Sequence, residues 1–235
     1  VGAHPNTKRL YETWGFLPAP PRSAAGYRLY TQEHLDQMIF ARTAFHTAWP
    51  GRAIRRSAAA LVRQAACADR PSALADARRH LLLVRAELAY AEEAASVLEG
   101  WAHSPPAPDA RPPLTIRAAA KAVGATTDML RGWERDGMLC VPRNPRNRYR
   151  EYGAPELARL RIIRLLRSAG YSTMAILRML LQLDGGRGQD LRAALDTPRA
   201  DEDVYFAADR WLTTLRAEEE IARKLICLLE ARGKD

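Results

Sequence analysis

The feature that most constrains the fold is a helix, a glycine turn and a second helix between residues 116 and 139. Apolar residues at helical spacing end at Gly124, and Thr126 follows, whose hydroxyl can cap the first turn of a new helix. Two short helices joined by a glycine-containing turn predict a helix-turn-helix, in which the second helix enters a DNA groove.

A basic and aromatic run follows this pair of helices and alternates like a strand at its end. Its members are Arg143, Arg146, Arg148, Tyr149, Arg150 and Tyr152. The order of helix, turn, helix and basic strand-like run predicts a winged helix-turn-helix.

These motifs resemble those of the MerR family of bacterial transcription regulators. The family's Leu-Arg-aromatic-aromatic-Glu helix, its Gly-apolar-Leu exit and its Arg…Tyr-Arg-x-Tyr wing are similar to residues 130–134, 137–139 and 148–152, except that Gly132 replaces an aromatic residue. The resemblance implies sequence-specific binding to a promoter operator in double-stranded DNA. It also implies distortion of the promoter spacer and RNA polymerase as a partner.

The same pattern occurs a second time at a spacing of 122 residues. Without a gap, the alignment pairs Val1-Gly-Ala3 with 123–125, Arg9-Leu-Tyr-Glu12 with 131–134, Gly15-Phe-Leu17 with 137–139, and Tyr27-Arg-Leu-Tyr30 with 149–152. We therefore expect a second domain of this type at the start of the chain. Because Val1 aligns with the turn, the first helix of that domain is expected to precede Val1 or to be missing.

Helix-period apolar spacing outside the wings predicts a mainly α fold, and each winged domain is followed by a long helix with the heptad seam of a coiled coil. The predicted order is a truncated winged helix-turn-helix domain at 1–66, a coiled-coil helix at 73–102, a proline-rich linker at 103–113, a second winged helix-turn-helix domain at 114–183, a loop and short helix at 184–202, and a second coiled-coil helix at 203–232.

The two seams suit each other, because the first is rich in alanine and the second carries Trp211 and leucines. The resemblance implies that such long helices pair antiparallel, as in a MerR-type dimer, and here they could do so within one chain. The proline-rich linker would span about 30 Å at roughly 3.1 Å per residue, enough to join the end of the first long helix to the second DNA-binding domain. We expect a fused pseudo-dimer, and the alternative is a homodimer of two-domain chains.

The residues expected at the DNA lie in the second helices and the wings, where arginines can reach phosphates and guanine edges. They are Arg9, Tyr11, Arg22, Tyr27, Arg28, Thr126, Thr127, Arg131, Trp133, Arg143, Arg146, Arg148, Tyr149 and Arg150. The two threonines can instead cap their helix, and Trp133 can pack beneath the wing. Glu12 and Glu134 are expected to pair with a nearby arginine, and Tyr30 and Tyr152 to anchor the wings.

The two domains are not identical. Lys8, Leu10 and Tyr11 align with Leu130, Gly132 and Trp133, and the second wing holds more arginines. We expect the second domain to bind more strongly and the operator to be asymmetric.

An alternative function is binding or sequestering a drug-like small molecule on a regulator fold. Aromatic residues near helix ends could line such a pocket or a regulator's effector site, although such residues more often fill a core. The candidates are Trp49, Trp101, Tyr205, Phe206 and Trp211. A third possibility is a non-specific nucleoid protein.

Composition bounds these classes. A net charge of +9 in 235 residues favours a polyanionic partner. The three cysteines are far apart and form no Cys-x-x-Cys pair, so we expect no metal site, a reducing compartment and a buried structural thiol at Cys227. No Gly-rich phosphate loop or catalytic triad order is present, and no apolar run could span a membrane. We expect a cytoplasmic, nucleoid-associated protein that is not an enzyme and needs no cofactor.

Overall fold

The computed structural model describes residues 4–47, 50–67, 69–103, 112–186, 190–198 and 207–232. These residues are mainly helical, as predicted. The elements are α1 (Pro5–Thr13), α2 (Gln32–Ala44), α3 (Arg52–Ala66), α4 (Arg70–His103), α5 (Ile116–Val123), α6 (Thr127–Arg135), α7 (Ala154–Ser168), α8 (Thr173–Asp184), α9 (Leu191–Asp196), the 3₁₀ helix η1 (Ala207–Arg210) and α10 (Trp211–Ala231). In the described residues, β pairing is confined to three isolated antiparallel bridges.

The chain divides into two compact units. Unit 1 comprises residues 1–88 and 213–235, and unit 2 comprises residues 89–212. The division falls inside α4 and near the start of α10. The predicted linker lies largely outside the described residues, as does the start of the predicted helix 203–232, whose described part is η1 followed by α10.

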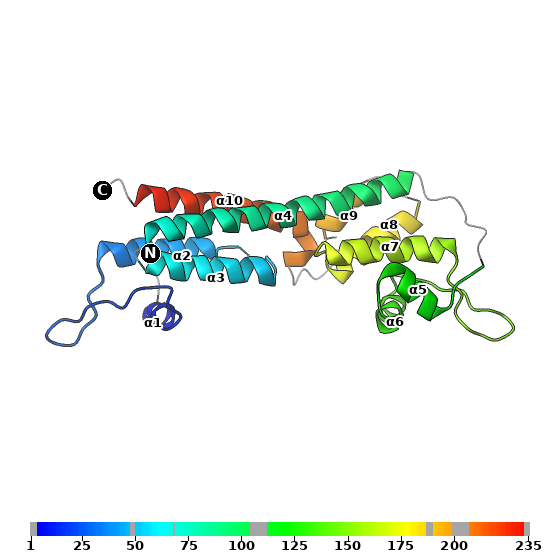
Figure 1. The fold of residues 1–235 in the computed structure, drawn as a ribbon, viewed down its shortest axis with the longest axis horizontal. Helices are drawn as coiled ribbons and strands as arrows, with labels where there is room; N and C mark the ends of the chain where they lie inside the picture. Colours follow the sequence, from blue (N-terminus) through cyan, green and yellow to red (C-terminus); the bar gives the residue numbers. More distant parts are fainter. Residues whose placement is uncertain are drawn as a thin grey trace. The chain divides into compact units, whose positions relative to one another are not determined.

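The core of unit 1 forms where α2, α3, α4 and α10 meet, and Figure 1 shows these helices running side by side. Small residues of α4 lie in one apolar cluster with large residues of α10. The buried members are Phe16, Phe40, Ala41, Ala44, Leu61, Val62, Ala73, Ala77, Leu225 and Leu229. The cluster therefore combines alanines of α4 with leucines of α10, the small and large residues on which the expected pairing of the two seams rests.

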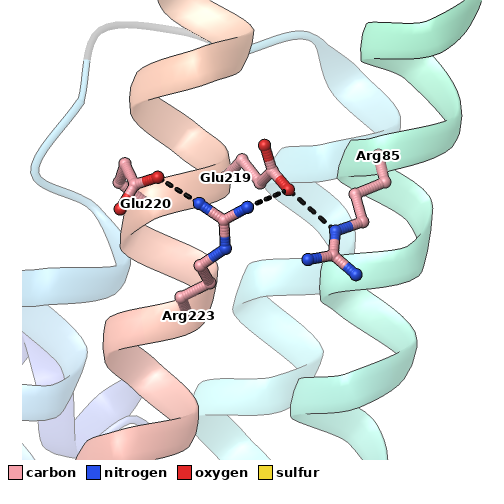
Figure 2. A network of polar contacts seen from close by, with 4 residues as sticks. All are labelled: Arg85, Glu219, Glu220 and Arg223. Atoms are coloured by element: carbon pink, nitrogen blue, oxygen red, sulfur yellow. Dashed lines mark hydrogen bonds and ion pairs between the residues drawn. The ribbon is translucent and has the colours of Figure 1, made fainter.

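Within unit 1, α4 and α10 run antiparallel. Arg70, at the start of α4, donates to the carbonyl of Leu229 near the end of α10, and Arg85 forms an ion pair with Glu219 at 2.7 Å. Figure 2 shows that Glu219 lies between Arg85 and Arg223, which also contacts Glu220. These exposed ion pairs add little stability singly, but a shared carboxylate favours one register of the two helices.

The prediction for Cys227 is wrong, because its thiol is exposed. Leu225 and Leu229 occupy the buried face of α10. Cys227 is two positions from each of them, about 200° around a helix, so it faces away from the core.

In unit 2, α5 to α8 enclose a second core. Large side chains that are fully buried include Leu130, Met138, Tyr152, Leu160, Ile163, Leu166, Tyr171 and Ile176. Trp211 extends this core: its indole N–H donates to the Ala169 carbonyl at 2.8 Å, and a Cβ on Gly170 would lie 2.7 Å from the ring. Gly170, at φ +96°, therefore lets the tryptophan pack against the turn between α7 and α8.

Candidate nucleic-acid interface

The interface is built on the turn between α5 and α6. Gly124 ends α5 with φ +63°, a left-handed conformation that suits glycine. The Thr126 hydroxyl then accepts a hydrogen bond from the amide of Met129 at 3.1 Å. Thr126 is thus the N-cap of α6, which supports the capping alternative for this residue. The short turn fixes α6 against α5.

A hairpin follows α6, and an ion pair holds it to that helix. Arg143 and Arg150 form an antiparallel bridge, and the Nε of Arg150 donates to Glu134 of α6 at 2.6 Å. That bond raises the pKa of Arg150, and both side chains are less than one-third exposed. The carboxylate therefore sets the position of the hairpin relative to α6, as expected for Glu134.

Asn144 shapes the hairpin tip and was missed as a candidate. Its side-chain oxygen accepts from the amide of Arg146 at 2.9 Å, and its side-chain nitrogen donates to Glu151 at 2.6 Å. The signal was present, because Asn144-Pro145 is a dipeptide that favours the start of a turn. Arg148 adopts φ +63° in the same tip.

The exposed side chains around α6 and the hairpin are basic and aromatic. Arg131 is exposed on α6, where it also pairs with Asp128 at 2.9 Å. The hairpin exposes Arg143, Arg146, Arg148 and Tyr149. Trp133 is buried at 6% exposure, so of its two alternatives the structure supports packing beneath the hairpin. Tyr152 is fully buried and pairs with Leu114, which anchors the hairpin as expected.

A matching arrangement lies 122 residues earlier. We call residues 5–30 the first module and residues 127–152 the second module; α1 and α6 begin them and are equally long. In the first module Arg28 donates to Glu12 at 3.0 Å, the counterpart of the Arg150–Glu134 pair. Gly15 and Gly137, each two residues after the end of its helix, have φ of +69° and +78°.

The two modules also differ. The first hairpin pairs Arg22 with Arg28, whereas the second pairs Arg143 with Arg150. At the offset of 122, Arg28 matches Arg150, but Arg22 matches residue 144 rather than Arg143. The gapless alignment therefore fails by one residue in the first half of the hairpin. Tyr30 is 41% exposed and donates to Glu12, whereas its counterpart Tyr152 is fully buried. Tyr27 and Tyr149 are similarly exposed, at 75% and 74%.

The remaining predicted DNA contacts of the first module lie on α1 and its hairpin. Arg9 is exposed and Tyr11 is partly buried, with its ring 5.7 Å from that of Phe16. Arg22 is exposed, and its guanidinium donates to the Gly26 carbonyl at 3.1 Å. The first module therefore presents fewer exposed cations than the second.

The predicted ligand residues are not brought together by any contact among the described residues. Trp49, Tyr205 and Phe206 lie outside those residues. Trp211 fills the core of unit 2, and Trp101 is partly buried with its indole N–H lacking a partner in the described structure. No group of His, Cys, Asp and Glu within the described ranges could hold a metal ion. No described helix is both long and apolar enough to cross a bilayer.

A capped helix after a tight turn, an attached hairpin and an exposed basic surface define a DNA-binding helix-turn-helix protein. Comparisons with known proteins agree: the model of the MerR HTH family of regulatory proteins matches residues 114–183. A mercuric resistance operon regulatory protein of Serratia marcescens is 36% identical over 119 residues, which are 51% of this chain and 78% of that protein. The corresponding Shigella flexneri protein is 29% identical over the same shares.

A probable heavy metal-dependent transcriptional regulator of Haemophilus influenzae is 27% identical over 117 residues, 50% of this chain and 83% of that protein. No solved structure matches the chain significantly. The chain belongs to the MerR family of helix-turn-helix transcription regulators.

Proposed function

We propose that this protein binds a promoter operator through two unequal MerR-type winged domains in one chain, as a fused pseudo-dimer, and regulates transcription there. The observation that carries the proposal is the second module. Its helix is capped by Thr126, its hairpin is held by the Arg150–Glu134 pair, and its exposed surface concentrates arginines. A helix of this kind can enter the major groove while the hairpin arginines contact phosphates.

The first module supports a second DNA-binding domain. It repeats the helix, the left-handed glycine and the arginine–glutamate pair at a constant offset. These contacts are specific to the arrangement of a helix with a hairpin, and a chance repeat of apolar spacing would not reproduce them. The antiparallel contacts of α4 with α10 support pairing of the two long helices inside one chain.

Regulation would follow the family's mechanism. Regulators of this type distort an overlong promoter spacer so that RNA polymerase engages both promoter elements. The free energy needed to bend and untwist the duplex would be offset by contacts of both modules with their half-sites. Because the modules differ in charge, the preferred operator would be asymmetric.

The test is to select bound fragments from genomic DNA and to measure binding to each half-site separately. We expect one preferred sequence with unequal half-sites, bound by a particle with the mass of one chain. Equal affinity for two inverted copies of one half-site, or a stable dimer at dilute concentration, would contradict the fused arrangement. Binding without sequence preference, with a log–log salt slope of about −0.9 per phosphate contacted, would instead indicate a non-specific nucleoid protein.

A further inference from the structure

One carbonyl in each module is held by a side chain from the next helix. Gln37 of α2 donates from Nε2 to the carbonyl of Phe16 at 3.0 Å. Arg159 of α7 donates from Nε to the carbonyl of Met138 at 2.6 Å. Both the donors and the acceptors are 122 residues apart. Gln37 and Arg159 therefore hold the residue three positions after the end of α1 and of α6, although their chemistry differs.

Phe16 and Met138 are hydrogen-bonded directly to α1 and α6, respectively. The amide of Phe16 donates to the carbonyl of Tyr11 at 2.8 Å, and the amide of Met138 donates to the carbonyl of Trp133 at 2.9 Å. These bonds close the last turns of α1 and α6. A side chain that holds the carbonyl of Phe16 or Met138 therefore restrains the end of the helix that would enter the DNA groove.

Gln37 and Arg159 are themselves bound by residues from different parts of the chain. In the second module, Asp184 at the end of α8 binds Arg159 with both carboxylate oxygens, at 2.6 and 2.8 Å. In the first module, Arg232 donates to the Oε1 of Gln37 at 3.0 Å. Asp184 is the last residue of α8 and directly follows the region matched by the family model, residues 114–183, whereas Arg232 directly follows α10.

Arg232 is firmly placed. It also donates to the carbonyl of Asp36 and lies over the ring of Phe40 at 5.1 Å. Arg70 donates to the carbonyls of Leu229 and Glu230, both at 2.9 Å, and so secures the end of the helix that carries Arg232. A planar guanidinium can donate to both oxygens while it stacks over the Phe40 ring, a geometry that the compact ammonium of lysine matches less well.

The Gln37 amide suits this arrangement. Its nitrogen donates to the carbonyls of Phe16 and Val62, both at 3.0 Å, and its oxygen accepts from Arg232. An arginine at position 37, as at the equivalent position 159, would place two positive charges together. The two modules therefore solve the same positioning problem with different partners.

We propose that Arg232 is a positioning residue for DNA binding by the first module and that α10 acts on α1 through Arg232, Gln37 and the Phe16 carbonyl. The second module carries its own equivalent, Asp184, so a change at the end of α10 alters one half-site and spares the other. This inference rests on the proposed function, because it assigns a half-site to the first module.

The experiment measures the affinity of the full chain for each half-site. Arg232→Ala should weaken binding at the first module's half-site about tenfold and change the other less than twofold, the loss typical of one charge-assisted contact. Asp184→Asn is the matched control and should give the reverse pattern. Equal losses at both half-sites, or no loss, would overturn the proposal.

A rescue distinguishes positioning from general folding. The double substitution Gln37→Arg with Arg232→Asp copies the Arg159–Asp184 pair and should restore the first half-site, whereas Gln37→Arg alone should not. A double variant that regains thermal stability but not half-site affinity would count against the proposal.

Hydrogen exchange gives a readout that needs no DNA. Arg232→Ala should reduce protection of the Phe16 and Leu17 amides, which both donate to the Tyr11 carbonyl, while Met138 stays protected. Unchanged protection at Phe16 would reject the inference even if the chain binds DNA. If the wild-type chain shows no half-site preference but this loss of protection occurs, the proposed function fails and the positioning contact stands.

Discussion

The two modules share a frame but not a surface. Each consists of a nine-residue helix, a left-handed glycine and a hairpin held by an arginine–glutamate pair. The second buries its anchoring tyrosine and exposes a dense cluster of arginines, whereas the first exposes that tyrosine and carries fewer cations. The comparison shows that the contacts which orient a hairpin can persist while the exposed side chains beside them change.

The largest expected effect is a loss of DNA affinity when the arginines that distinguish the second module from the first are removed. Replacing Arg143, Arg146 and Arg148 together by alanine should weaken DNA binding roughly a hundredfold and lower the salt slope by up to about 2.7, because each cation that contacts a phosphate contributes about 0.9. Arg22→Ala in the first module should cost less than tenfold. Titrations at several salt concentrations would measure both, and equal losses would remove the distinction between the modules.

A pH effect should separate the units that carry the modules. His80 of α4 is fully buried in unit 1, and burial lowers the pKa of its imidazole to about 4. Because the unfolded pKa is higher, this group's contribution to stability is complete above about pH 6.5 and is lost as the pH falls toward 4, by up to about 3 kcal/mol.

Glu218, buried in the same unit, acts in the opposite direction, because burial raises the pKa of its carboxyl and acid then favours the folded state. The useful measurement is therefore the difference between the wild type and His80→Gln in chemical unfolding from pH 7 to 4.5, with proteolysis mapping each unit. The variant should lose less stability in unit 1 on acidification. A parallel decline of both proteins would show that His80 does not titrate in this range.

Replacing Tyr152 and Tyr30 by phenylalanine should change the stability of the protein in opposite directions. Tyr152 has a buried hydroxyl without a partner in the described structure, and burial raises its pKa. Tyr152→Phe should therefore stabilise the protein by about 1 kcal/mol, since an unsatisfied buried hydroxyl is removed. Tyr30→Phe should destabilise it by about 1 kcal/mol, because Tyr30 donates to Glu12 at 2.8 Å. Denaturant midpoints would measure both, and a loss in Tyr152→Phe would mean that its hydroxyl is satisfied.

Effects no larger than those of the tyrosines are expected at the helix starts. Thr126→Ala removes the side-chain cap of α6 and should cost about 1 kcal/mol. His4→Ala removes the corresponding cap of α1, where the ring Nδ1 accepts from the amide of Asn6 at 3.2 Å, and should cost less because histidine is not among the side chains preferred at an N-cap. Thermal unfolding of the two variants would rank them. A larger loss for His4→Ala would reverse the ranking.

Much of this frame could be predicted from the sequence. Gly124 and Thr126 marked the turn, and the aligned residues Glu12 and Glu134 were expected to meet arginines, because local chemistry and spacing determine these contacts. The one-residue difference between the two hairpins could not be predicted. It arises because Ser23 closes the tip of the first hairpin by donating to the Tyr27 carbonyl, whereas Asn144 closes the tip of the second by donating to the Tyr149 carbonyl. The exposure of Cys227 follows from its helix face, which an apolar neighbourhood in the sequence does not show.

Gln37 and Arg159 were missed for a different reason. They are not alike, and their shared task becomes visible only when the carbonyls of Phe16 and Met138 are located. Arg232 lies far from Gln37 in the sequence, and no local pattern joins them. Such contacts depend on tertiary packing rather than on periodicity.

The most direct test of two unequal DNA-binding modules in one chain is a footprint of the full-length protein on its selected operator. We predict two protected segments of different strength, of which the stronger disappears when the second module's hairpin arginines are replaced and the weaker when Arg9 and Arg22 are replaced. Uniform protection that fades with salt and ignores these substitutions would contradict the account.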